Sequence, residues 1–587
     1  MTTTRRNLFK ILGGSAAGAL FTPAPWRLIT DTALWSENWP GIPRPARGEI
    51  RAKFTNCLLC PAGCAVRARC VGEQPVALAG VGGGLCPFGL TAHHLPYHPA
   101  RLKEGPVKEA AAAVAEAAAK CGPGERVAVL DLRPGRTASW TYRRAMAAAR
   151  GLYIAPAESA VAVDLASAKT VLSLGAPLLD GWGTPARVFA ARDGFRLIQA
   201  EAVESRTAAL ADVWLPVRPG AEESIVRGLA GTLSHGEAAE AAGIEESQME
   251  WLARELTEKG PALVVDGTMS PAVVALNVQL GGWGRTIGPR REAPVPDAWK
   301  TAAAVTDLAA VPDGSIRALV IDESAPGAYV AWEAIERKLV RDHPVVVTLA
   351  WSRNGYGRHT EWVLPAAVYP EATGDVAAAI DDRTPAFRPG APLVAAPAGV
   401  VNPAEFIAGA AGMAAGDALR ERADAIHRTG RGTLLTYSDG KKVPIKEMKA
   451  DDFWKALNAG GRWTGEGEAS GPAPKVVAEA AQAAAGLSAE DLPFAIEPAE
   501  ARVSPLVSPL MSKVYQESNL RLAPNGVMLH PRDARACGVE AGGRALLMTA
   551  YGRREVEIRT DSSVRPGVVV VAGWPDGGAA RAKVVRI

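Results

Sequence analysis

The stretch Cys57-Leu58-Leu59-Cys60-Pro61-Ala62-Gly63-Cys64 decides how this sequence is interpreted, because its three cysteines are separated by two and three residues. A fourth, Cys86, follows a glycine-rich stretch. Three thiolates at this spacing can each bind one iron on one face of a cubane cluster, and a thiolate returning from elsewhere in the chain completes the set. The spacing therefore predicts a [4Fe-4S] cluster held by Cys57, Cys60, Cys64 and Cys86.

Two other uses of these thiols stay open. C-x2-C pairs also bind zinc, although zinc sites usually combine two separated pairs, and disulfides are the second alternative. Cys70 could compete as a ligand, but it lies in the alternating, strand-like run 65–71, whose pleat decides its direction. The glycines within 80–84 do not precede a helix start, as a phosphate loop would. We expect them to shape a hairpin that returns Cys86 to the other three.

The composition of the 587-residue chain is that of a globular protein. Charged residues make up 22% and hydrophobic residues 48%, which excludes a disordered or fibrous chain. The length corresponds to about four domains. The formal net charge is +3 and no dense run of Lys or Arg occurs, so we expect no nucleic-acid partner.

The N-terminus predicts an export signal over residues 1–30. Arg5-Arg6-Asn7-Leu8-Phe9-Lys10 precedes the short apolar run 11–21, which is the twin-arginine pattern. A membrane-spanning helix needs about twenty apolar residues, so this run is too short to be one. We expect a folded protein exported to the periplasmic side of the cytoplasmic membrane, with residues 31–50, rich in Pro and Trp, as a linker.

Short apolar runs alternate with helical segments through the middle of the chain. The Ala-rich segment 108–120 and the segment 332–341 have the apolar pattern of helices. This alternation is typical of an α/β fold with doubly wound parallel sheets, whose ligands bind outside the carboxyl ends of the strands. The expected strands are 126–130, 170–174, 195–199, 262–265, 318–321 and 344–348.

Three further stretches, taken with the cysteine motif, resemble the molybdopterin-dinucleotide oxidoreductase superfamily, which includes formate dehydrogenases, nitrate reductases and polysulfide reductases. The stretch 171–177 looks like the family's strand and glycine turn under a dinucleotide, and 201–220 looks like its second nucleotide-contacting loop. The stretch 508–574, with Pro524-Asn525-Gly526-Val527-Met528-Leu529-His530-Pro531, resembles its C-terminal barrel.

This resemblance implies a domain layout. It gives a [4Fe-4S] domain over 51–105 that ends in a segment like 97–102, α/β domains over 106–415, and a double-psi β-barrel over 505–587. Residues 416–504 look like an insertion or linker. The resemblance also implies contacts to a molybdopterin guanine dinucleotide, although ordinary turn chemistry is an equal alternative for the two glycines. The contacting residues would be Gly175, Glu201, Arg218, Gly220, Gln516 and Asn519.

Two departures from the family pattern argue against a working Mo or W centre. Many members place a Cys, selenocysteine, Ser or Asp ligand before the first glycine turn, whereas the connection 154–162 offers only Ser159, beside Glu158. A serine in such a turn more often caps a helix or turn. Many members also have a basic residue two positions after the fourth cysteine, where this chain has Phe88, which neither donates a hydrogen bond nor carries charge.

Two polar groups have weaker interpretations. His93, His94 and His98 follow the cysteines, where they either line an electron exit or lie exposed in a loop. Asp381, Asp382 and Arg383 are expected in a solvated turn.

We therefore expect an iron–sulfur electron-transfer subunit of a membrane-associated quinone oxidoreductase complex, with no catalytic residue of its own and without working Mo or W. It is similar in character to the molybdopterin-like subunits of menaquinone reductase complexes and alternative complex III. That resemblance implies three partners: a second iron–sulfur subunit, a multihaem cytochrome c and an integral membrane quinone-binding subunit. An active Mo/W-bis-pterin oxidoreductase and a purely structural scaffold subunit are the alternatives.

Overall fold

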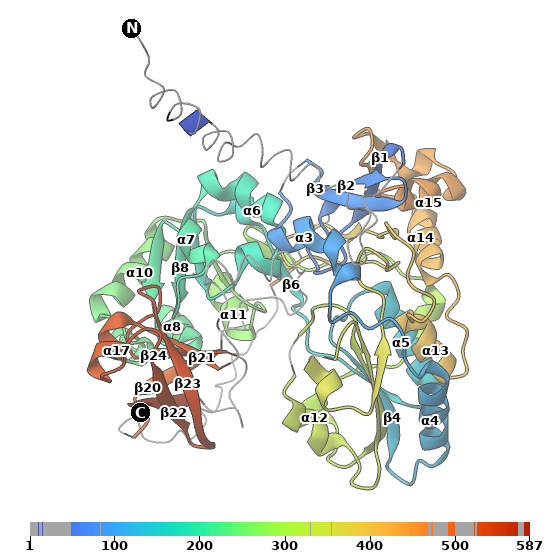
Figure 1. Ribbon diagram of the computed structural model, residues 1–587. Helices are drawn as coiled ribbons and strands as arrows, with labels where there is room; N and C mark the ends of the chain where they lie inside the picture. The colour runs from blue at the N-terminus through green and yellow to red at the C-terminus, as the bar shows by residue number, and fades with distance from the viewer. Residues whose placement is uncertain are drawn as a thin grey trace. The chain divides into compact units, whose positions relative to one another are not determined.

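A computed structural model gives the fold of the chain (Figure 1). Nearly all of the twin-arginine segment, and both Gln516 and Asn519, lie outside the residues that it describes. None of the helices among the described residues is long and apolar enough to cross a bilayer. The structure describes residues 10, 14–15, 48–82, 84–328, 330–353, 355–467, 471–473, 491–498, 522, 525–572 and 580–587.

The chain divides into two compact units. The smaller comprises residues 1–51 and 70–74, and within it the amide of Gly72 donates to the carbonyl of Glu49 at 2.9 Å. Gly48 has φ +141° there, and a Cβ atom on it would lie 2.9 Å from Gly72 Cα, so this approach requires glycine. The larger unit comprises residues 52–69 and 75–587 and contains the sheets and the barrel.

The main sheet of the larger unit has six parallel strands in the order β12-β5-β4-β13-β14-β15. Numbered along the chain, this order is 3-2-1-4-5-6, that of doubly wound folds, which bind ligands where the strand order reverses. Here that switch point lies between β4 and β13. The strands are β4 (Arg126–Asp131), β5 (Leu152–Ile154), β12 (Val305–Thr306), β13 (Ile316–Glu323), β14 (Val345–Ala350) and β15 (Trp362–Pro365).

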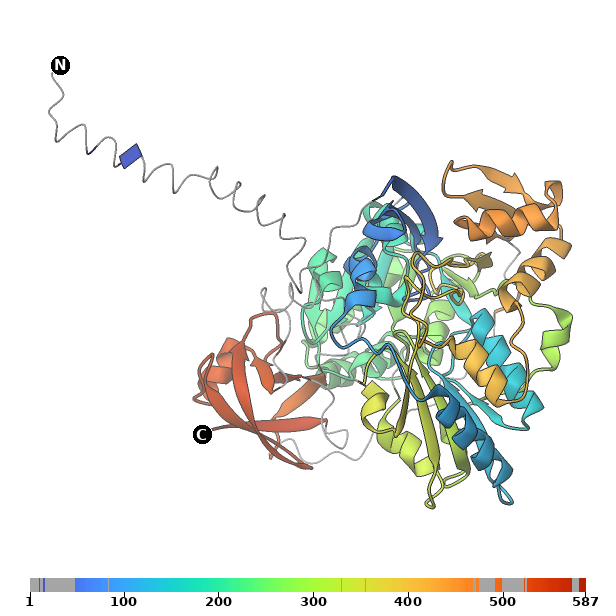
Figure 2. The ribbon, with the colours of Figure 1, turned by 45° about the vertical axis from the view of Figure 1, so that its right-hand side comes forward.

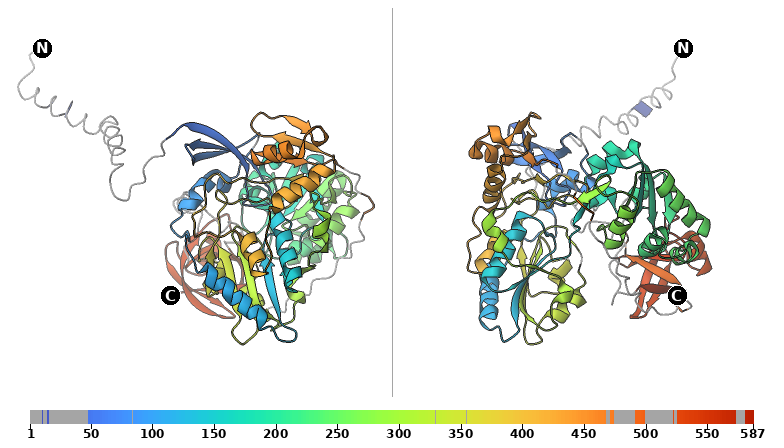
Figure 3. Two further views of the ribbon diagram at one scale, coloured as in Figure 1. Left: turned by 90° about the vertical axis from the view of Figure 1, so that its right-hand side faces the viewer. Right: turned by 180° about the vertical axis from the view of Figure 1, so that it is seen from behind.

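Helices cover both faces of this sheet (Figure 1, Figure 3). Val127 and Val129 of β4 belong to a core shared with α4, α5 and α13. Ala128 and Leu130 belong to a second core, which contains Ile335 of α12. Because successive strand residues face opposite sides, burial on both faces explains the unbroken apolar run in the sequence. The helices are α4 (Val107–Ala119), α5 (Thr137–Ala148), α12 (Trp332–Lys338) and α13 (Pro403–Ala410).

A second parallel sheet, ordered β10-β7-β8-β9, is formed by chain that lies between β5 and β12. Each of the six expected strands overlaps a strand of one of the two sheets, and both expected helices are present as α4 and α12. The α/β class with parallel sheets is therefore confirmed, whereas the assignment of each strand to one of the two sheets was not predicted. The strands of the second sheet are β7 (Thr170–Leu174), β8 (Arg196–Glu201), β9 (Val213–Pro216) and β10 (Ala262–Asp266).

The cysteine motif lies in a small antiparallel region followed by short helices. A three-stranded sheet has the order β1-β2-β3, and Cys86 directly precedes α3. In β2 alternate residues are buried, among them Cys70. The elements are β1 (Ile50–Asn56), β2 (Ala65–Val71), β3 (Gln74–Gly80), α3 (Pro87–Thr91) and the 3₁₀ helix η2 (Ala92–Tyr97).

Part of the segment that the sequence left as an insertion or linker is folded. Helices α14 and α15 pack with a sheet ordered β16-β19-β17-β18 around Phe387, Phe453 and Trp463. The carbonyl oxygen of Gly461 in this subdomain accepts a hydrogen bond from the side chain of Asn56. This bond anchors the start of the cysteine loop, residues 57–64. Its elements are β16 (Ala386–Phe387), α14 (Ala418–Arg428), β17 (Thr433–Thr436), β18 (Lys442–Pro444), α15 (Ala450–Asn458) and β19 (Gly461–Thr464).

The C-terminal strands form a closed barrel, drawn in red in Figure 2. Its order is β20-β24-β21-β23-β22-β25, with β20 parallel to β24 and β21 parallel to β23. The barrel that the sequence predicts near the C-terminus is therefore present. The strands are β20 (Phe494–Pro498), β21 (Gly526–Leu529), β22 (Arg544–Thr549), β23 (Gly552–Thr560), β24 (Val568–Val571) and β25 (Arg581–Arg586).

Candidate functional site

The fold brings the four cysteines of the predicted cluster together. All four are free thiols; Cys57 and Cys64 are buried, and Cys60 and Cys86 are partly buried. Burial raises the pKa of Cys57 well above its usual value, and the charges of Cys60, Cys64 and Cys86 raise it further. Cys86 also acts on Cys60 and Cys64. Cys86 therefore lies within electrostatic reach of the other three thiols, and the cluster itself stays a prediction.

Hydrogen bonds to distant parts of the chain hold the cysteine loop. Asn56 Nδ2 donates to the carbonyl oxygens of Pro389 and Gly461, at 2.8 and 3.1 Å. Thr55 Oγ1 donates to Ala391 O at 2.8 Å. The amide of Cys57 donates to the carbonyl of Cys64 at 2.9 Å, which closes the loop on itself. Protein contacts therefore set its conformation.

Gly63 allows the cysteine loop to pack closely against Val376 and Arg388. Its φ is +53°, and a Cβ atom there would lie 2.6 Å from Val376 Cγ2 and 2.9 Å from Arg388 Cδ. A side chain would therefore be strained by the backbone and would collide with two neighbours. The glycine in Pro61-Ala62-Gly63-Cys64 is a packing requirement of the site.

The thiols are in surroundings that disfavour thiolates. Burial, then the charges of the other thiols, raises the pKa of Cys60, and burial raises the pKa of Cys64 to about 11. The guanidinium of Arg388 is the cation that acts in the opposite direction on Cys64. Metal ligation requires thiolates, and a cationic group among the four sulfurs would favour their ionisation.

The residues present are of the kind that an iron–sulfur cluster needs. Four free thiols that act on one another could each bind a different iron of a cubane. Within the described chain, no three or more His, Cys, Asp or Glu side chains are placed to hold one ion. The cluster therefore stays a prediction, with zinc and disulfides as its alternatives.

Asp381 and Asp382 lie in a buried ion-pair chain, so the expectation of a solvated turn is wrong. The Asp381 side chain is 1% exposed and accepts a hydrogen bond from the amide of Thr184 at 2.6 Å. Arg187 contacts both aspartates, and Arg388 binds Asp382 at 2.8 Å. The charge of Asp381 also raises the pKa of Cys60 and Cys64, so this chain borders the thiols. Nothing in the local sequence reveals the arginines that bury these carboxylates.

An arginine from elsewhere in the chain lies against Phe88. Phe88 is buried on α3, and the Cζ atom of Arg206 is 5.8 Å from the centre of its ring. This is a cation–π distance. Position 88 itself carries no charge, as expected. The sequence did not reveal that Arg206, the first residue of α7 (Arg206–Leu210), places a cation against the ring at this position.

The histidines after Cys86 are half-buried, so the expectation of an exposed loop is wrong. The rings of His93 and His94, both in η2, are 4.0 Å apart. Burial, then the charge of His94, lowers the pKa of His93 to about 4. The ring of His98 meets Trp351 edge-on at 4.8 Å. The ring contacts do not test electron transfer. The hypothesis that these histidines line an electron exit therefore stays a prediction.

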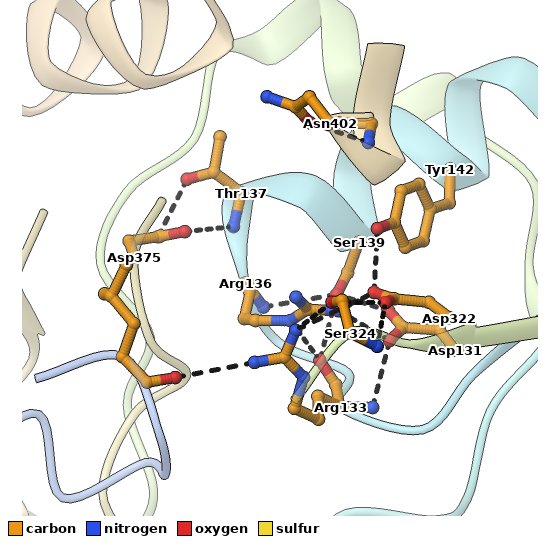
Figure 4. Close-up of polar contacts among 12 residues, drawn as sticks. Asp131, Arg133, Arg136, Thr137, Ser139, Tyr142, Asp322, Ser324, Asp375 and Asn402 are labelled. Carbon is orange, nitrogen blue, oxygen red and sulfur yellow. Dashed lines mark hydrogen bonds and ion pairs between the residues drawn. The ribbon is translucent and has the colours of Figure 1, made fainter. Parts of the chain in front are cut away.

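The switch point between β4 and β13 is occupied by charged groups of the chain itself (Figure 4). Asp131 is the last residue of β4, and Asp322 is the next-to-last residue of β13. Both aspartates are fully buried. One guanidinium nitrogen of Arg136 binds both carboxylates, at 2.8 and 2.9 Å. Asp131 also accepts from the hydroxyls of Ser139 and Tyr153, at 2.6 and 2.9 Å. A doubly wound fold would offer a ligand this position, but here its carboxylates already have partners.

The second aspartate is held as firmly as the first. Asp322 accepts from the hydroxyls of Tyr142 and Ser324, at 2.9 and 2.6 Å. Burial alone would raise the pKa of Asp322, but the charges of Arg136 and Arg133 hold it well below its usual value. Arg133 also donates to the carbonyl oxygen of Leu58 at 3.4 Å. The ionic network at the switch point therefore reaches the cysteine loop.

Glu323 follows Asp322 and has an unusual pKa. Burial raises the pKa of Glu323 from 4.5 to about 7, although its carboxylate accepts hydrogen bonds from the amide of Tyr356. The negative charge of Asp322 acts in the same direction as burial. The carboxyl end of β13 therefore carries one firmly ionised side chain and one that titrates near neutral pH.

Two predicted dinucleotide contacts lie on the second sheet. Gly175, after β7, has φ +67°. A Cβ atom added to it would have Glu222 Oε1 as its nearest neighbour, at 4.0 Å, so the space around this glycine is open. Glu201, at the end of β8, is buried and accepts from the amide of Ser205 and from Gln199 Nε2, at 2.8 and 3.1 Å. Glu201 therefore has a structural role in the turn before α7.

The other predicted contacts lie after β9. Gly220 has φ +76° and open space around it, so it could admit a ligand. Arg218 is exposed, and its guanidinium donates to the carbonyl of Glu240 at 2.8 Å. It also lowers the pKa of Arg565, secondary to the effect of burial, so these two guanidiniums are neighbours. Gln516 and Asn519 lie outside the described residues.

The Ser159 hydroxyl makes hydrogen bonds within its own turn. Its hydroxyl donates to the carbonyl of Val161 at 2.9 Å and accepts from the amide of the same residue at 3.1 Å. Glu158 beside it pairs with Arg290 at 2.8 Å. These contacts are those of the turn residue that the sequence favoured over a metal ligand.

Comparisons with known proteins agree with this architecture. Residues 511–584 match the model of the Molydopterin dinucleotide binding domain family. The menaquinone reductase, molybdopterin-binding-like subunit of Nitratidesulfovibrio vulgaris is 29% identical over 282 residues, which span 39% of this chain and only 40% of that protein. Acetylene hydratase from Pelobacter acetylenicus shares the fold, with a TM-score of 0.65 at 13% identity over 91% of this chain and 100% of that one. The resemblance to molybdopterin-dinucleotide oxidoreductases is confirmed.

Replacing Arg136 tests the network at the switch point. Arg136→Leu removes the guanidinium that binds both buried aspartates, and we expect a loss of about 3–5 kcal/mol in unfolding free energy, as when one partner of a buried ion pair is removed. Arg126→Leu, at the exposed start of β4, is the matched control and should cost less than about 0.5 kcal/mol. Denaturant unfolding followed by tryptophan fluorescence measures both. Equal stability of the two variants would show that the network does not contribute this much to the free energy of unfolding.

Replacing Glu323 tests its titration. The folded-state pKa of about 7 exceeds the unfolded value of 4.5, so the folded protein binds more protons between these values and loses stability as pH rises through them. Glu323→Gln should therefore be more stable than the wild type at pH 8, by at most about 3 kcal/mol, and nearly equal to it at pH 5. Thermal unfolding at the two pH values, with Glu336→Gln on the exposed face of α12 as control, measures the difference. A pH-independent effect would contradict the raised pKa.

Proposed function

We propose that this chain is the iron–sulfur electron-transfer subunit of an exported, membrane-associated quinone oxidoreductase complex, without a working Mo or W centre of its own. One observation carries the proposal. Four mutually interacting, disulfide-free thiols stand ready for a cluster, whereas the neighbouring switch point, where the fold would hold a ligand, has both aspartates bound by the chain itself.

The residues around the thiols are suited to holding a redox cluster. A [4Fe-4S] cluster on Cys57, Cys60, Cys64 and Cys86 would supply one-electron transfer, with a potential set by burial and by hydrogen bonds to its sulfurs. The loop is anchored through Asn56 and limits solvent around two of the four thiols. Such a site needs no group that moves a proton, because transfer between centres is the whole reaction.

The switch point supports the absence of a working metal–pterin centre. Asp131 and Asp322 each accept several hydrogen bonds from within the chain, and Arg136 compensates both charges. Ser159, the one hydroxyl in the connection 154–162, is bonded to its own turn. A Mo or W ion would therefore lack a free protein ligand at the place that the family pattern reserves for one.

The relative's name and the N-terminal sequence support the proposed partners and location. The curated relative is a subunit of a menaquinone reductase, and we propose a comparable assembly here. Its other members would be a second iron–sulfur subunit, a multihaem cytochrome c and an integral membrane quinone-binding subunit. The Arg5-Arg6 motif supports twin-arginine export to the periplasmic side of the cytoplasmic membrane.

An active Mo/W oxidoreductase is the second candidate. The match to the Molydopterin dinucleotide binding domain and the open turns at Gly175 and Gly220 favour retention of a pterin dinucleotide. A pterin dinucleotide without a metal is compatible with the first proposal, whereas a bound metal is not. The two candidates are therefore separated by metal content.

Elemental analysis of the anaerobically purified protein is the test. We expect about four irons per chain, the content of one cubane cluster, and Mo and W well below one per chain. Cys64→Ala should lose most of the iron, whereas Cys121→Ala, whose thiol donates to the carbonyl of Ala117, should keep it. Stoichiometric Mo or W would favour the active enzyme. A folded wild-type protein free of iron would favour the scaffold subunit.

A further inference from the structure

Tyr369 has a buried hydroxyl that lacks a partner. Its side chain is 3% exposed, and the hydroxyl oxygen makes no hydrogen bond within the part of the chain that the structure describes. Buried hydroxyls are almost always hydrogen-bonded, because leaving one unpaired costs free energy. An acceptor belonging to a bound group would remove that cost.

The groups near this hydroxyl are the cluster cysteines. After burial, the charges of Cys57 and Cys64 are what raise the pKa of Tyr369 well above its usual value. A phenol has one proton to donate, and thiolate or sulfide sulfur is an acceptor. Tyr369 therefore lies within electrostatic reach of two of the four predicted ligands.

The segment that carries Tyr369 is held firmly. Arg101, in the segment that ends the cysteine domain, forms an ion pair of 2.5 Å with Glu371, and both side chains are at most 2% exposed. Arg101 also donates to the carbonyl of Ala366 at 2.8 Å. The amide of Ala372 donates to the carbonyl of Val368 at 2.9 Å and closes the turn around Tyr369. The phenol is thus fixed in place by contacts that do not involve its hydroxyl.

We propose that Tyr369 is a positioning residue of the iron–sulfur site, whose hydroxyl donates a hydrogen bond to sulfur on the Cys57 and Cys64 side of the cluster. This inference rests on the proposed function, because it requires a cluster on the four cysteines. Reduction adds negative charge to the cluster, and a hydrogen bond to sulfur stabilises that charge. Tyr369 therefore raises the reduction potential.

Tyr369→Phe tests this tuning. The substitution removes only an otherwise unpaired hydroxyl, so the protein should fold and keep its iron. The reduced cluster should be disfavoured about tenfold, which is a fall of about 59 mV in midpoint potential for a one-electron couple. A redox titration of the anaerobic holoprotein, followed by electron paramagnetic resonance, measures it. An unchanged potential with full iron content would overturn the inference.

Tyr437→Phe is the matched control. Tyr437 is also buried beside the cysteine loop, but its hydroxyl already donates to Asn56 Oδ1 at 2.5 Å. Its loss should weaken the anchoring of the loop and lower iron retention, with a much smaller shift of potential. If both variants shift the potential equally, the effect is one of general packing and the specific role of Tyr369 is excluded.

A second measurement covers the case in which Tyr369→Phe loses its cluster. Electron–nuclear double resonance of the reduced wild-type protein, prepared in H2O and in D2O after unfolding and reconstitution, should show one strongly coupled exchangeable proton beyond those of the backbone amides that hydrogen-bond to Cys57, Cys60 and Cys64. No such proton would exclude the hydrogen bond. A wild-type protein without any cluster would instead contradict the proposed function, so the two failures are distinguishable.

Discussion

Four thiols, two buried and two partly buried, that act on one another form the constraint on which this structure depends. Each would have to ionise to bind metal, and burial together with the neighbouring thiols opposes that in Cys57, Cys60 and Cys64. A positively charged inorganic core would compensate them in a way that Arg388 alone does not. The anchoring through Asn56, the glycine at position 63 and the bonded segment of Tyr369 all maintain this arrangement.

The switch point of the main sheet has the opposite electrostatic character. Asp131 and Asp322 are fully buried, but Arg136 compensates them within the chain. The aspartates therefore have their cation within the chain, whereas the proposed cluster would supply the charge that compensates the thiolates. Arg133 touches both, since it interacts with Asp322 and donates to Leu58 in the cysteine loop. We infer that this network stabilises the scaffold beside the cysteine loop.

Features with a local pattern could be predicted from the sequence, and features made by distant contacts could not. The spacing of Cys57, Cys60 and Cys64 and the apolar runs of β4 and β7 depend on neighbours in the chain. The burial of Asp381 depends on Thr184 and Arg187, almost two hundred residues away. Arg206 at Phe88, and Tyr369 at the thiols, have no motif that would mark them. The assignment of each strand to one of the two sheets could not be predicted, because each apolar run fits either sheet equally well.

The most direct test of the central claim is diffraction from crystals of the intact protein, with data collected on both sides of the iron absorption edge. We predict anomalous density for one cluster bonded by Cys57, Cys60, Cys64 and Cys86, with Arg136 still between Asp131 and Asp322. Iron-free thiols, or a heavy metal seated at the carboxyl ends of β4 and β13 with Arg136 displaced, would contradict it.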